Sequence, residues 1–456
     1  VTLFTRPRRF GKTLMMSMME SFFDVRRDSK EVFKGLNVLE NHPAFCEEWM
    51  NRYPVLFVSM KDVEGLDFAT AFKKLKAVLA DVCKKLEDLP DKEGVNSADA
   101  EIFHRLMFKS GDMEEVQNAL KTLMRMLYAA YGKPVILLID EYDAPLTACL
   151  DQPELFEEVR KTLASFYAVF KSNDSPLRFL FITGITKYSK VSIFSEMNNL
   201  NDITLDVEYG TLLGYTEEEL GRYFADYIAQ AAEALELSPG ELLARMRERY
   251  DGYGFDKMAC THVYSPWSTL MFLSKPRNGL ENYWIESGGQ TSLLTNYIKG
   301  HSLKNPDQYG RPQVIESTRL SMSADVRTID DVALLTQAGY LTIKALEDDA
   351  LVLGYPNREV AQAMAKLYTS ILLQKKGLAE IGAAGVVRCL RENDVDAFVG
   401  RLNKAFLAID YTSYPVKDEY KCCAMVAVFL AGAGLVATSQ THNALGRSDL
   451  EAVLDS

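Results

Sequence analysis

The stretch that decides the fold is residues 1–13, which read VTLFTRPRRFGKT. Its first five residues are β-branched, aromatic or aliphatic, which is typical of a strand. From Gly11 to Phe23 the apolar residues then recur at helical spacing. A tight turn that leads from a strand into a helix points backbone N–H groups at an anion, helped by the positive end of the helix. We therefore expect a strand, turn and helix that can bind phosphate.

The turn carries the residue types that phosphate binding needs. Gly11, Lys12 and Thr13 match the end of the pattern G-x-x-x-x-G-K-[ST], in which the lysine reaches the β- and γ-phosphates and the hydroxyl ligates Mg²⁺. Arg6 stands where that pattern has its first glycine, and Pro7 can hold the turn instead because its φ is fixed. The expected nucleotide-binding residues are Arg6, Pro7, Arg8, Arg9, Phe10, Gly11, Lys12 and Thr13.

A second motif makes this interpretation stronger, because a G-K-T triplet alone is common by chance. Residues 137–141 read LLIDE, an apolar strand that ends in two acids. Parallel sheets bind ligands at the carboxyl ends of their strands. We expect Asp140 to hold Mg²⁺ together with Thr13, and Glu141 to orient and polarise the attacking water, with Lys12 completing the catalytic set. The alternative is an acidic helix cap that follows a strand.

A further apolar strand, residues 177–183, ends in a polar residue. Thr183 is expected to sense the γ-phosphate, and the alternative is an ordinary strand end. Lys187 and Lys190 follow within four residues of one another. They predict either a phosphate or partner contact or a solvated loop.

Strands alternate with helices over roughly the first two hundred residues, which predicts an α/β fold. The strands at 54–58, 134–139 and 177–183 are continuously apolar, as in a parallel sheet buried on both faces. We expect the doubly wound sheet of a P-loop NTPase. Thr216 and Glu219 predict the capped start of a mostly helical region. Further on, a helix at 331–339 and strands at 340–343 and 350–353 suit a winged-helix-like module.

Composition narrows the class of protein. The net charge of −12 over 456 residues argues against a chain that coats nucleic acid through overall charge. Seven scattered cysteines without a C-x-x-C pair suit a reducing compartment, and the five histidines show no zinc spacing. No apolar run is long enough to span a membrane. We expect a cytoplasmic protein without a membrane partner. The sequence starts without methionine, so we also expect a fragment.

Four motifs resemble the bacterial AAA-ATPase-like family, in the same order and over nearly the whole chain. They are R-P-R-R-F-G-K-T at 6–13, L-L-I-D-E-Y-D-A-P-L at 137–146, the stretch 181–205, and Y-D-G-Y-G-F at 250–255, for which we expect turn and packing roles. In that family arginine in place of the first glycine is the normal form. The resemblance implies ATP binding with Mg²⁺, and hydrolysis by Lys12, Thr13, Asp140 and Glu141.

The same family commonly carries a C-terminal PD-(D/E)XK nuclease-superfamily domain. Gly446-Arg447-Ser448-Asp449 resembles the opening of its signature, and Glu419 resembles its helical carboxylate, although a solvated helix residue is an equal alternative. Gln440 stands where relatives often have a glutamate. The sequence stops at Ser456 before a Glu-x-Lys, so we expect no nuclease activity of this chain. DNA remains a partner expected of the parent protein.

These expectations give four segments: a P-loop AAA-ATPase-like domain at 1–213, a helical lid-like region at 214–310, a winged-helix-like module at 311–364, and an incomplete nuclease-like α/β segment at 365–456. The expected function is Mg²⁺-dependent ATP hydrolysis that regulates the nuclease-like segment. The alternative is a nucleotide-dependent switch with little turnover. Whether the chain forms a homo-oligomer is left open by the sequence. The arginine-finger candidates are Arg6, Arg8, Arg9, Arg311, Arg319 and Arg358.

Overall fold

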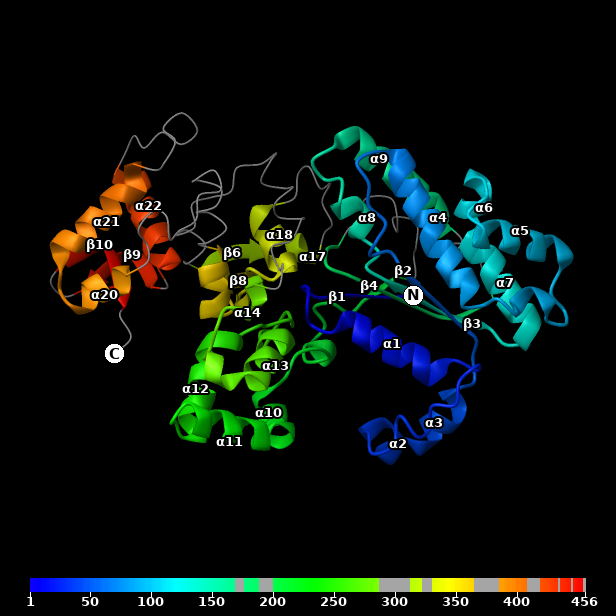
Figure 1. The fold of residues 1–456 in the computed structure, drawn as a ribbon, viewed down its shortest axis with the longest axis horizontal. Coiled ribbons are helices and arrows are strands. Elements are labelled where there is room, and N and C mark those ends of the chain that lie inside the picture. Colours follow the sequence, from blue (N-terminus) through cyan, green and yellow to red (C-terminus); the bar gives the residue numbers. More distant parts are fainter. Residues whose placement is uncertain are drawn as a thin grey trace. The chain divides into compact units, whose positions relative to one another are not determined.

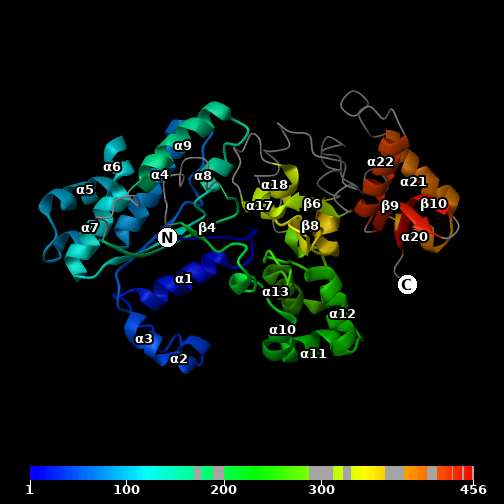
Figure 2. The same ribbon diagram turned by 180° about the vertical axis from the view of Figure 1, so that it is seen from behind.

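The computed structural model describes residues 1–168, 176–187, 200–286, 312–321, 330–364, 385–407, 419–433, 435–443 and 446–453. The chain divides into two compact units. The first holds the residues up to 206 and the segment 318–338, and the second holds most of the rest. Figures 1 and 2 show the elements of both units from opposite sides.

The first unit is built on a five-stranded parallel sheet in the order β2-β3-β4-β1-β5. The strands are β1 (Thr2–Thr5), β2 (Val55–Ser59), β3 (Val135–Asp140), β4 (Leu177–Gly184) and β5 (Asn201–Asp202). Every residue of β3 is buried, as expected for a central parallel strand. Because β4 lies between β1 and β3, the carboxyl ends of these three strands are neighbours.

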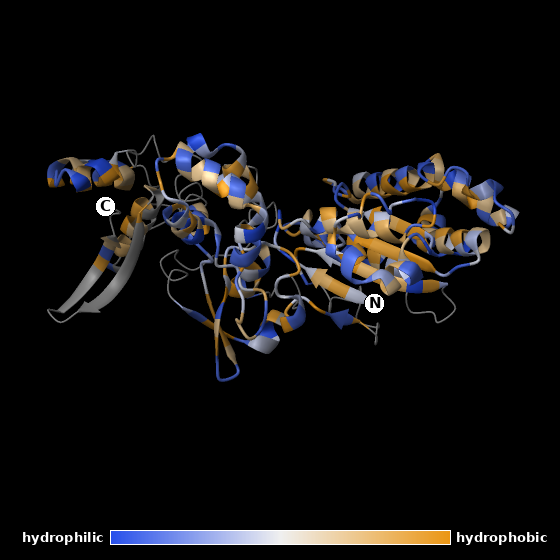
Figure 3. Cartoon of the chain, turned by 90° about the horizontal axis from the view of Figure 1, so that it is seen from below, coloured by the Kyte–Doolittle hydropathy of each residue, from blue (hydrophilic) through white to orange (hydrophobic). Residues whose placement is uncertain are grey.

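Helices cover both faces of this sheet. Alternate residues of the strands, such as Leu137 and Ile139 of β3, join one hydrophobic core with α4 (Phe68–Lys84), α5 (Ser97–Met107), α7 (Ala119–Tyr131) and α9 (Pro153–Tyr167). Figure 1 shows α1 (Lys12–Phe23) on the opposite face. In Figure 3 the strands of this sheet are mostly hydrophobic, whereas hydrophilic and hydrophobic residues alternate along the helices around it. The predicted α/β fold with a parallel sheet flanked by helices is confirmed.

Shorter helices complete the first unit. They are α2 (Asn37–Asn41), α3 (Pro43–Trp49), α6 (Met113–Gln117), α8 (Ala144–Thr147) and α18 (Asp331–Ala338).

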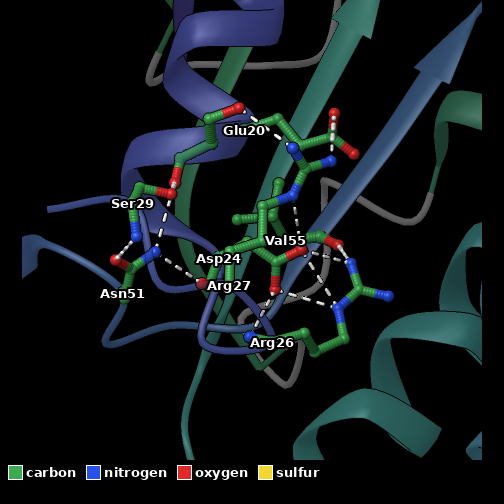
Figure 4. Close-up of polar contacts among 8 residues, drawn as sticks. Glu20, Asp24, Arg26, Arg27, Ser29, Asn51 and Val55 are labelled. Atoms are coloured by element: carbon green, nitrogen blue, oxygen red, sulfur yellow. Dashed lines mark hydrogen bonds and ion pairs between the residues drawn. The ribbon is translucent and has the colours of Figure 1, made fainter. Parts of the chain in front are cut away.

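A polar network ties the far end of α1 to the sheet (Figure 4). The buried Asp24 carboxylate accepts hydrogen bonds from the Arg26 side chain, the shortest at 2.9 Å from Nε and 2.7 Å from Nη2, and one from the Arg26 backbone N–H at 3.1 Å. Arg26 Nη2 also donates to the carbonyl oxygen of Val55, the first residue of β2, at 2.9 Å. Asn51 donates to the carbonyl oxygen of Asp24 and accepts from the backbone of Ser29. Helix α1, which starts directly after Gly11, is therefore anchored at its other end.

The second unit begins with helices. They are α10 (Glu217–Tyr223), α11 (Ala225–Ala234), α12 (Pro239–Tyr250), α13 (Pro266–Ser274) and α14 (Tyr283–Glu286). The predicted cap of α10 is confirmed: the Glu219 backbone N–H donates to Thr216 Oγ1 at 3.2 Å, and Thr216 N donates back to the Glu219 carboxylate at 2.9 Å.

An antiparallel three-stranded sheet follows in the order β6-β8-β7, from β6 (Gln313–Glu316), β7 (Thr342–Glu347) and β8 (Ala350–Gly354). The chain between β6 and β7 includes α17 (Ser317–Ser321). The predicted hairpin is present as β7 and β8, while β6 was not predicted. The winged-helix-like module and the predicted boundaries at 213, 310 and 364 stay predictions.

The Y-D-G-Y-G-F motif has the turn and packing role expected of it. Tyr250 and Tyr253 are buried. Gly252 has φ +92, and a Cβ there would overlap the carbonyl oxygen of Pro356. A Cβ on Gly254 would likewise overlap a carbonyl oxygen of β7.

The last described segments are α20 (Val386–Arg391), α21 (Val395–Leu407), α22 (Glu419–Gly432) and the hairpin of β9 (Val436–Asn443) with β10 (Gly446–Val453). Helix α22 packs against both strands of this hairpin. The arrangement is an α/β segment, but nothing in it identifies a nuclease fold. Among the described residues, no helix combines the length and apolar character that a membrane crossing requires.

Candidate functional site

The turn between β1 and α1 is hydrogen-bonded to the side chain of Lys12, the first residue of α1. Lys12 Nζ donates to the carbonyl oxygens of Arg6 at 2.8 Å and Pro7 at 2.9 Å. Gly11 has φ +92, in the left-handed region that glycine adopts without cost. Apart from the chain neighbours of Gly11, no atom of the described residues lies within 4 Å of a Cβ placed on it, so its backbone conformation, and not lack of space, requires glycine. The first N–H groups of α1 therefore follow a turn of the predicted kind.

Lys12 is buried, and burial lowers its pKa from 10.5 to about 8 because the ammonium loses its hydration. The carboxylates of Glu141, Asp143 and Asp140 act in the opposite direction, and the guanidinium of Arg8 lowers the pKa further. The turn thus buries a positive charge that a bound anion would stabilise.

Thr13 and Asp140, separated by 127 residues in sequence, meet directly. Thr13 Oγ1 donates to Asp140 Oδ2 at 2.8 Å. Asp140 is buried, and burial raises its pKa, although the Thr13 hydroxyl and Lys12 act the other way. Its Oδ1 atom has no hydrogen-bond partner in the described part of the chain. An exposed hydroxyl beside a carboxylate offers the oxygen ligands that Mg²⁺ prefers.

Glu141 directly follows β3 in an uncommon backbone conformation. Its φ of +51 lies in the left-handed region, which non-glycine residues adopt mainly where their surroundings hold them. The side chain is half-buried, and burial followed by the nearby Asp140 raises its pKa, which Lys12 partly offsets. A carboxylate with a raised pKa is the better proton acceptor, as a general base requires.

Thr183 lies on the strand between the turn and the acidic pair. On β4 it is in register with Phe4 of β1, and its neighbour Ile182 is in register with Ile139 of β3. Thr183 is fully buried, and its Oγ1 has no hydrogen-bond partner among the residues that the structure describes. Asp140, Glu141 and Thr183 therefore lie at adjacent strand ends. The hydrogen bond from Thr13 to Asp140 brings the start of α1, with Lys12 and Thr13, to the same edge of the sheet.

The sequence predicted no role for Tyr142 and Asp143, the two residues that follow Glu141. Asp143 accepts hydrogen bonds from the backbone of Ile185 and Thr186, and Tyr142 Oη donates to the carbonyl oxygen of Thr186 at 2.8 Å. The only signal in the sequence was the second aspartate of D-E-Y-D.

The arginine candidates separate by their contacts. Arg6 is buried, donates from Nη1 to the carbonyl oxygens of Thr204 at 2.7 Å and Thr5 at 3.0 Å, and lies 4.3 Å over the Phe4 ring centroid. Its side chain anchors the segment after β5 to the turn. Arg8 and Arg9 are half-buried in the turn.

Two other arginine candidates have acidic partners: Arg319 pairs with Asp330 at 3.9 Å and Arg358 with Glu248 at 3.1 Å. Arg311 lies outside the described residues. An arginine finger among the six stays a prediction.

Lys187 is buried, and its Nζ pairs with Asp202 Oδ2 of β5 at 2.8 Å. The solvated-loop interpretation is therefore wrong for Lys187, because the side chain has no solvated charge. Its pKa is lowered by burial, with Asp202 acting in the opposite direction. The backbone N–H of Lys187 donates to Gln337 Oε1 of α18 at 3.1 Å. Lys190 lies outside the described residues.

The nuclease-like residues lie in the last described segments. Glu419 is the exposed first residue of α22, and Asp449 lies on β10. Within the described ranges, no group of three or more His, Cys, Asp or Glu side chains is placed to hold a metal ion. The roles of Glu419 and Asp449 stay predictions.

Comparisons with known proteins support the family resemblance for the first part of the chain. Residues 1–194 match the model of a family described as "Predicted AAA-ATPase". An uncharacterized protein in the vnfD 5′ region of Azotobacter chroococcum mcd 1 is 31% identical over 374 residues. The matched region covers 81% of this chain and 63% of that relative, so the chain spans less than two thirds of the relative's length. The predicted resemblance is confirmed for residues 1–194.

Proposed function

We propose that the first unit binds ATP with Mg²⁺ and hydrolyses it. The observation that carries the proposal is the 2.8 Å contact between Thr13 Oγ1 and Asp140 Oδ2, formed beside the buried Lys12 at the start of α1. It lies within the residues that match predicted AAA-ATPases.

The residues present fit a magnesium nucleotide. Lys12 supplies a positive charge that two carbonyl oxygens hold in the nucleotide-free turn, and phosphate oxygens would be stronger acceptors for it. Asp140 Oδ1 and Thr183 Oγ1 are buried polar atoms without a partner in the described chain, which a ligand would supply. Mg²⁺ would be held by Thr13 and Asp140, and when bound it supplies charge that offsets the negative phosphates.

Each remaining side chain has one task in hydrolysis. Lys12 binds and orients the β- and γ-phosphates. Glu141 orients the attacking water and accepts its proton. Thr183 contributes a hydroxyl at the strand end nearest both motifs, where it can contact the γ-phosphate.

A nucleotide-dependent switch with little turnover is the second candidate. The hydrogen bond from the Lys187 backbone to Gln337 favours it, because it joins the edge of the nucleotide site to a helix 150 residues away in sequence. We also propose that the nucleotide state regulates the C-terminal segment, and that the longer protein contacts DNA through that region. This part rests on the family resemblance alone, as does a homo-oligomer, whereas the proposed cytoplasmic location rests on the scattered cysteines of the sequence.

Calorimetry with ATP and Mg²⁺ tests the nucleotide site. Lys12→Ala should lower ATP affinity by about a hundredfold or more, since it removes the only lysine that contacts the turn's carbonyl oxygens among the described residues. Lys34→Ala is the matched control, because Lys34 is exposed and pairs only with Glu31 in the described structure. Equal affinity in the unmutated chain and Lys12→Ala would refute the assignment of the phosphate-binding turn.

A further inference from the structure

Asp143 is a buried carboxylate without an ion-pair partner among the described residues. It is held by the segment that follows β4. Ile185 N donates to its Oδ2 at 3.1 Å, Thr186 N donates at 2.7 Å, and Thr186 Oγ1 donates at 2.6 Å. Burying a carboxylate is costly unless its hydrogen bonds are satisfied. This one is satisfied entirely by a single loop.

The contact between the two loops is close. A Cβ on Gly184 would overlap Asp143 Oδ1 and lie 2.8 Å from Tyr142 Cδ1. The backbone N–H of Tyr142 donates to the carbonyl oxygen of Thr183 at 3.1 Å. The loop after β3 and the loop after β4 are therefore fastened to each other on both sides of Gly184.

The contacts between these two loops begin directly after Glu141 and Thr183, the residues proposed to act at the γ-phosphate. Glu141 is two positions before Asp143, and Thr183 is two positions before Ile185. Glu141 is held in a left-handed conformation between the sheet and α8, where Ala144 N donates to its carbonyl oxygen at 3.0 Å. Such a conformation persists only where neighbouring contacts fix it. The hydrogen bond from Tyr142 N to the carbonyl oxygen of Thr183 joins the residue after Glu141 to β4, and the side-chain hydrogen bonds of Asp143 join the same loop to the residues that follow β4.

We propose that Asp143 is a positioning residue for ATP hydrolysis, which fixes Glu141 and Thr183 relative to each other by clamping the loop after β4 onto the loop after β3. This inference rests on the proposed function. Asp143 does not touch the nucleotide in this account. It acts through the geometry of the two side chains that do.

The chain offers a matched control for Asp143. Asp256 in the second unit is also fully buried and also holds a loop, through the backbone of Met258, Cys260 and Thr261 and through Thr261 Oγ1. The variant pair Asp143→Asn and Asp256→Asn therefore removes the same kind of carboxylate from two different places. A milder pair is Thr186→Val and Thr261→Val, which each remove one hydroxyl from these carboxylates.

The experiment measures kcat and KM for ATP hydrolysis, and ATP affinity by calorimetry, in the full chain. Asp143→Asn should lower kcat by about a hundredfold while affinity changes less than about threefold, because small misplacements of reacting groups slow chemistry more than binding. Thr186→Val should lower kcat by about tenfold with the same selectivity. Asp256→Asn and Thr261→Val should leave both parameters within about twofold.

Two results would overturn this inference and leave the proposed function standing. In the first, the unmutated chain hydrolyses ATP and Asp143→Asn has the same kcat. In the second, Asp143→Asn and Thr186→Val lose kcat and ATP affinity in parallel. If Asp143→Asn does not fold, Thr186→Val decides by the same criterion. An unmutated chain that binds ATP without turnover would instead refute the proposed hydrolysis, and this inference with it.

Discussion

The buried Lys12 of the proposed phosphate-binding turn should make nucleotide binding depend on pH in a range where few side chains titrate. In the nucleotide-free protein, burial lowers the pKa of Lys12 to about 8. Phosphate oxygens beside the ammonium would favour its charged form and raise that pKa again. ATP binding should therefore take up protons.

The size of the effect follows from that pKa. Near pH 8, about half of the free protein carries a neutral Lys12, so binding should take up about 0.5 proton; at pH 7 the figure falls to about 0.1, and at pH 9 it rises to about 0.9. Affinity should fall by about fivefold from pH 8 to pH 9, and by close to tenfold for each pH unit above about pH 9 until the raised pKa of the bound form is reached.

The same pKa predicts the stability of the nucleotide-free fold. Because the folded pKa of about 8 lies below the ordinary value of 10.5, the unfolded chain binds more protons between these pH values. The contribution of Lys12 to the free energy of unfolding should therefore rise with pH through this window. Below pH 8 the buried charge costs about 3 kcal/mol, at about 1.4 kcal/mol for each tenfold change in the proton equilibrium.

Calorimetry at pH 7, 8 and 9, in buffers of different ionisation enthalpy, measures this proton uptake. Lys12→Arg is the control, because arginine keeps its charge over the whole range. Binding heats at pH 8 and 9 that do not depend on the buffer, or an equal proton uptake in Lys12→Arg, would refute the reasoning.

Three further substitutions test separate parts of the site. Thr13→Val should lower ATP affinity by about tenfold with Mg²⁺ and leave it nearly unchanged without the metal, since it removes the hydroxyl that meets Asp140; equal losses under both conditions would argue against the metal role. Gly11→Ala should destabilise the fold by about 1–2 kcal/mol because of its φ of +92, an effect that an unchanged melting temperature would disprove. Arg6→Met should lower the free energy of unfolding of the first unit by about 2–4 kcal/mol, because the hydrogen bonds to the carbonyl oxygens of Thr204 and Thr5 are lost. Denaturant unfolding measures this change, and an unchanged free energy of unfolding would refute the anchoring role of Arg6.

The sequence predicted the elements of the first unit well because their signals are local. The strands at 54–58, 134–139 and 177–183 appear within one or two residues as β2, β3 and β4, since continuous apolar runs mark buried parallel strands. The helix predicted from Gly11 to Phe23 is α1. Because parallel strands end at one edge, the predicted residues at those ends were expected to meet there.

What the sequence did not predict depends on tertiary contacts. The place of β4 between β1 and β3 follows from packing, which periodicity does not record. The two-residue β5 is too short for a periodic signal. Lys187 looked like part of a basic loop, and only the fold brings it to Asp202. Asp143 was indistinguishable from an ordinary loop acid until the loop after β4 was seen to donate to it.

Steady-state ATP hydrolysis by the unmutated chain and by Glu141→Gln, with ATP affinity measured in parallel, tests the central claim most directly. The account predicts Mg²⁺-dependent hydrolysis by the unmutated chain. In Glu141→Gln the rate should fall by about 10²–10⁴-fold, the usual contribution of a general base, while ATP binding is retained. Binding without hydrolysis in the unmutated chain, or equal rates in both proteins, would contradict it.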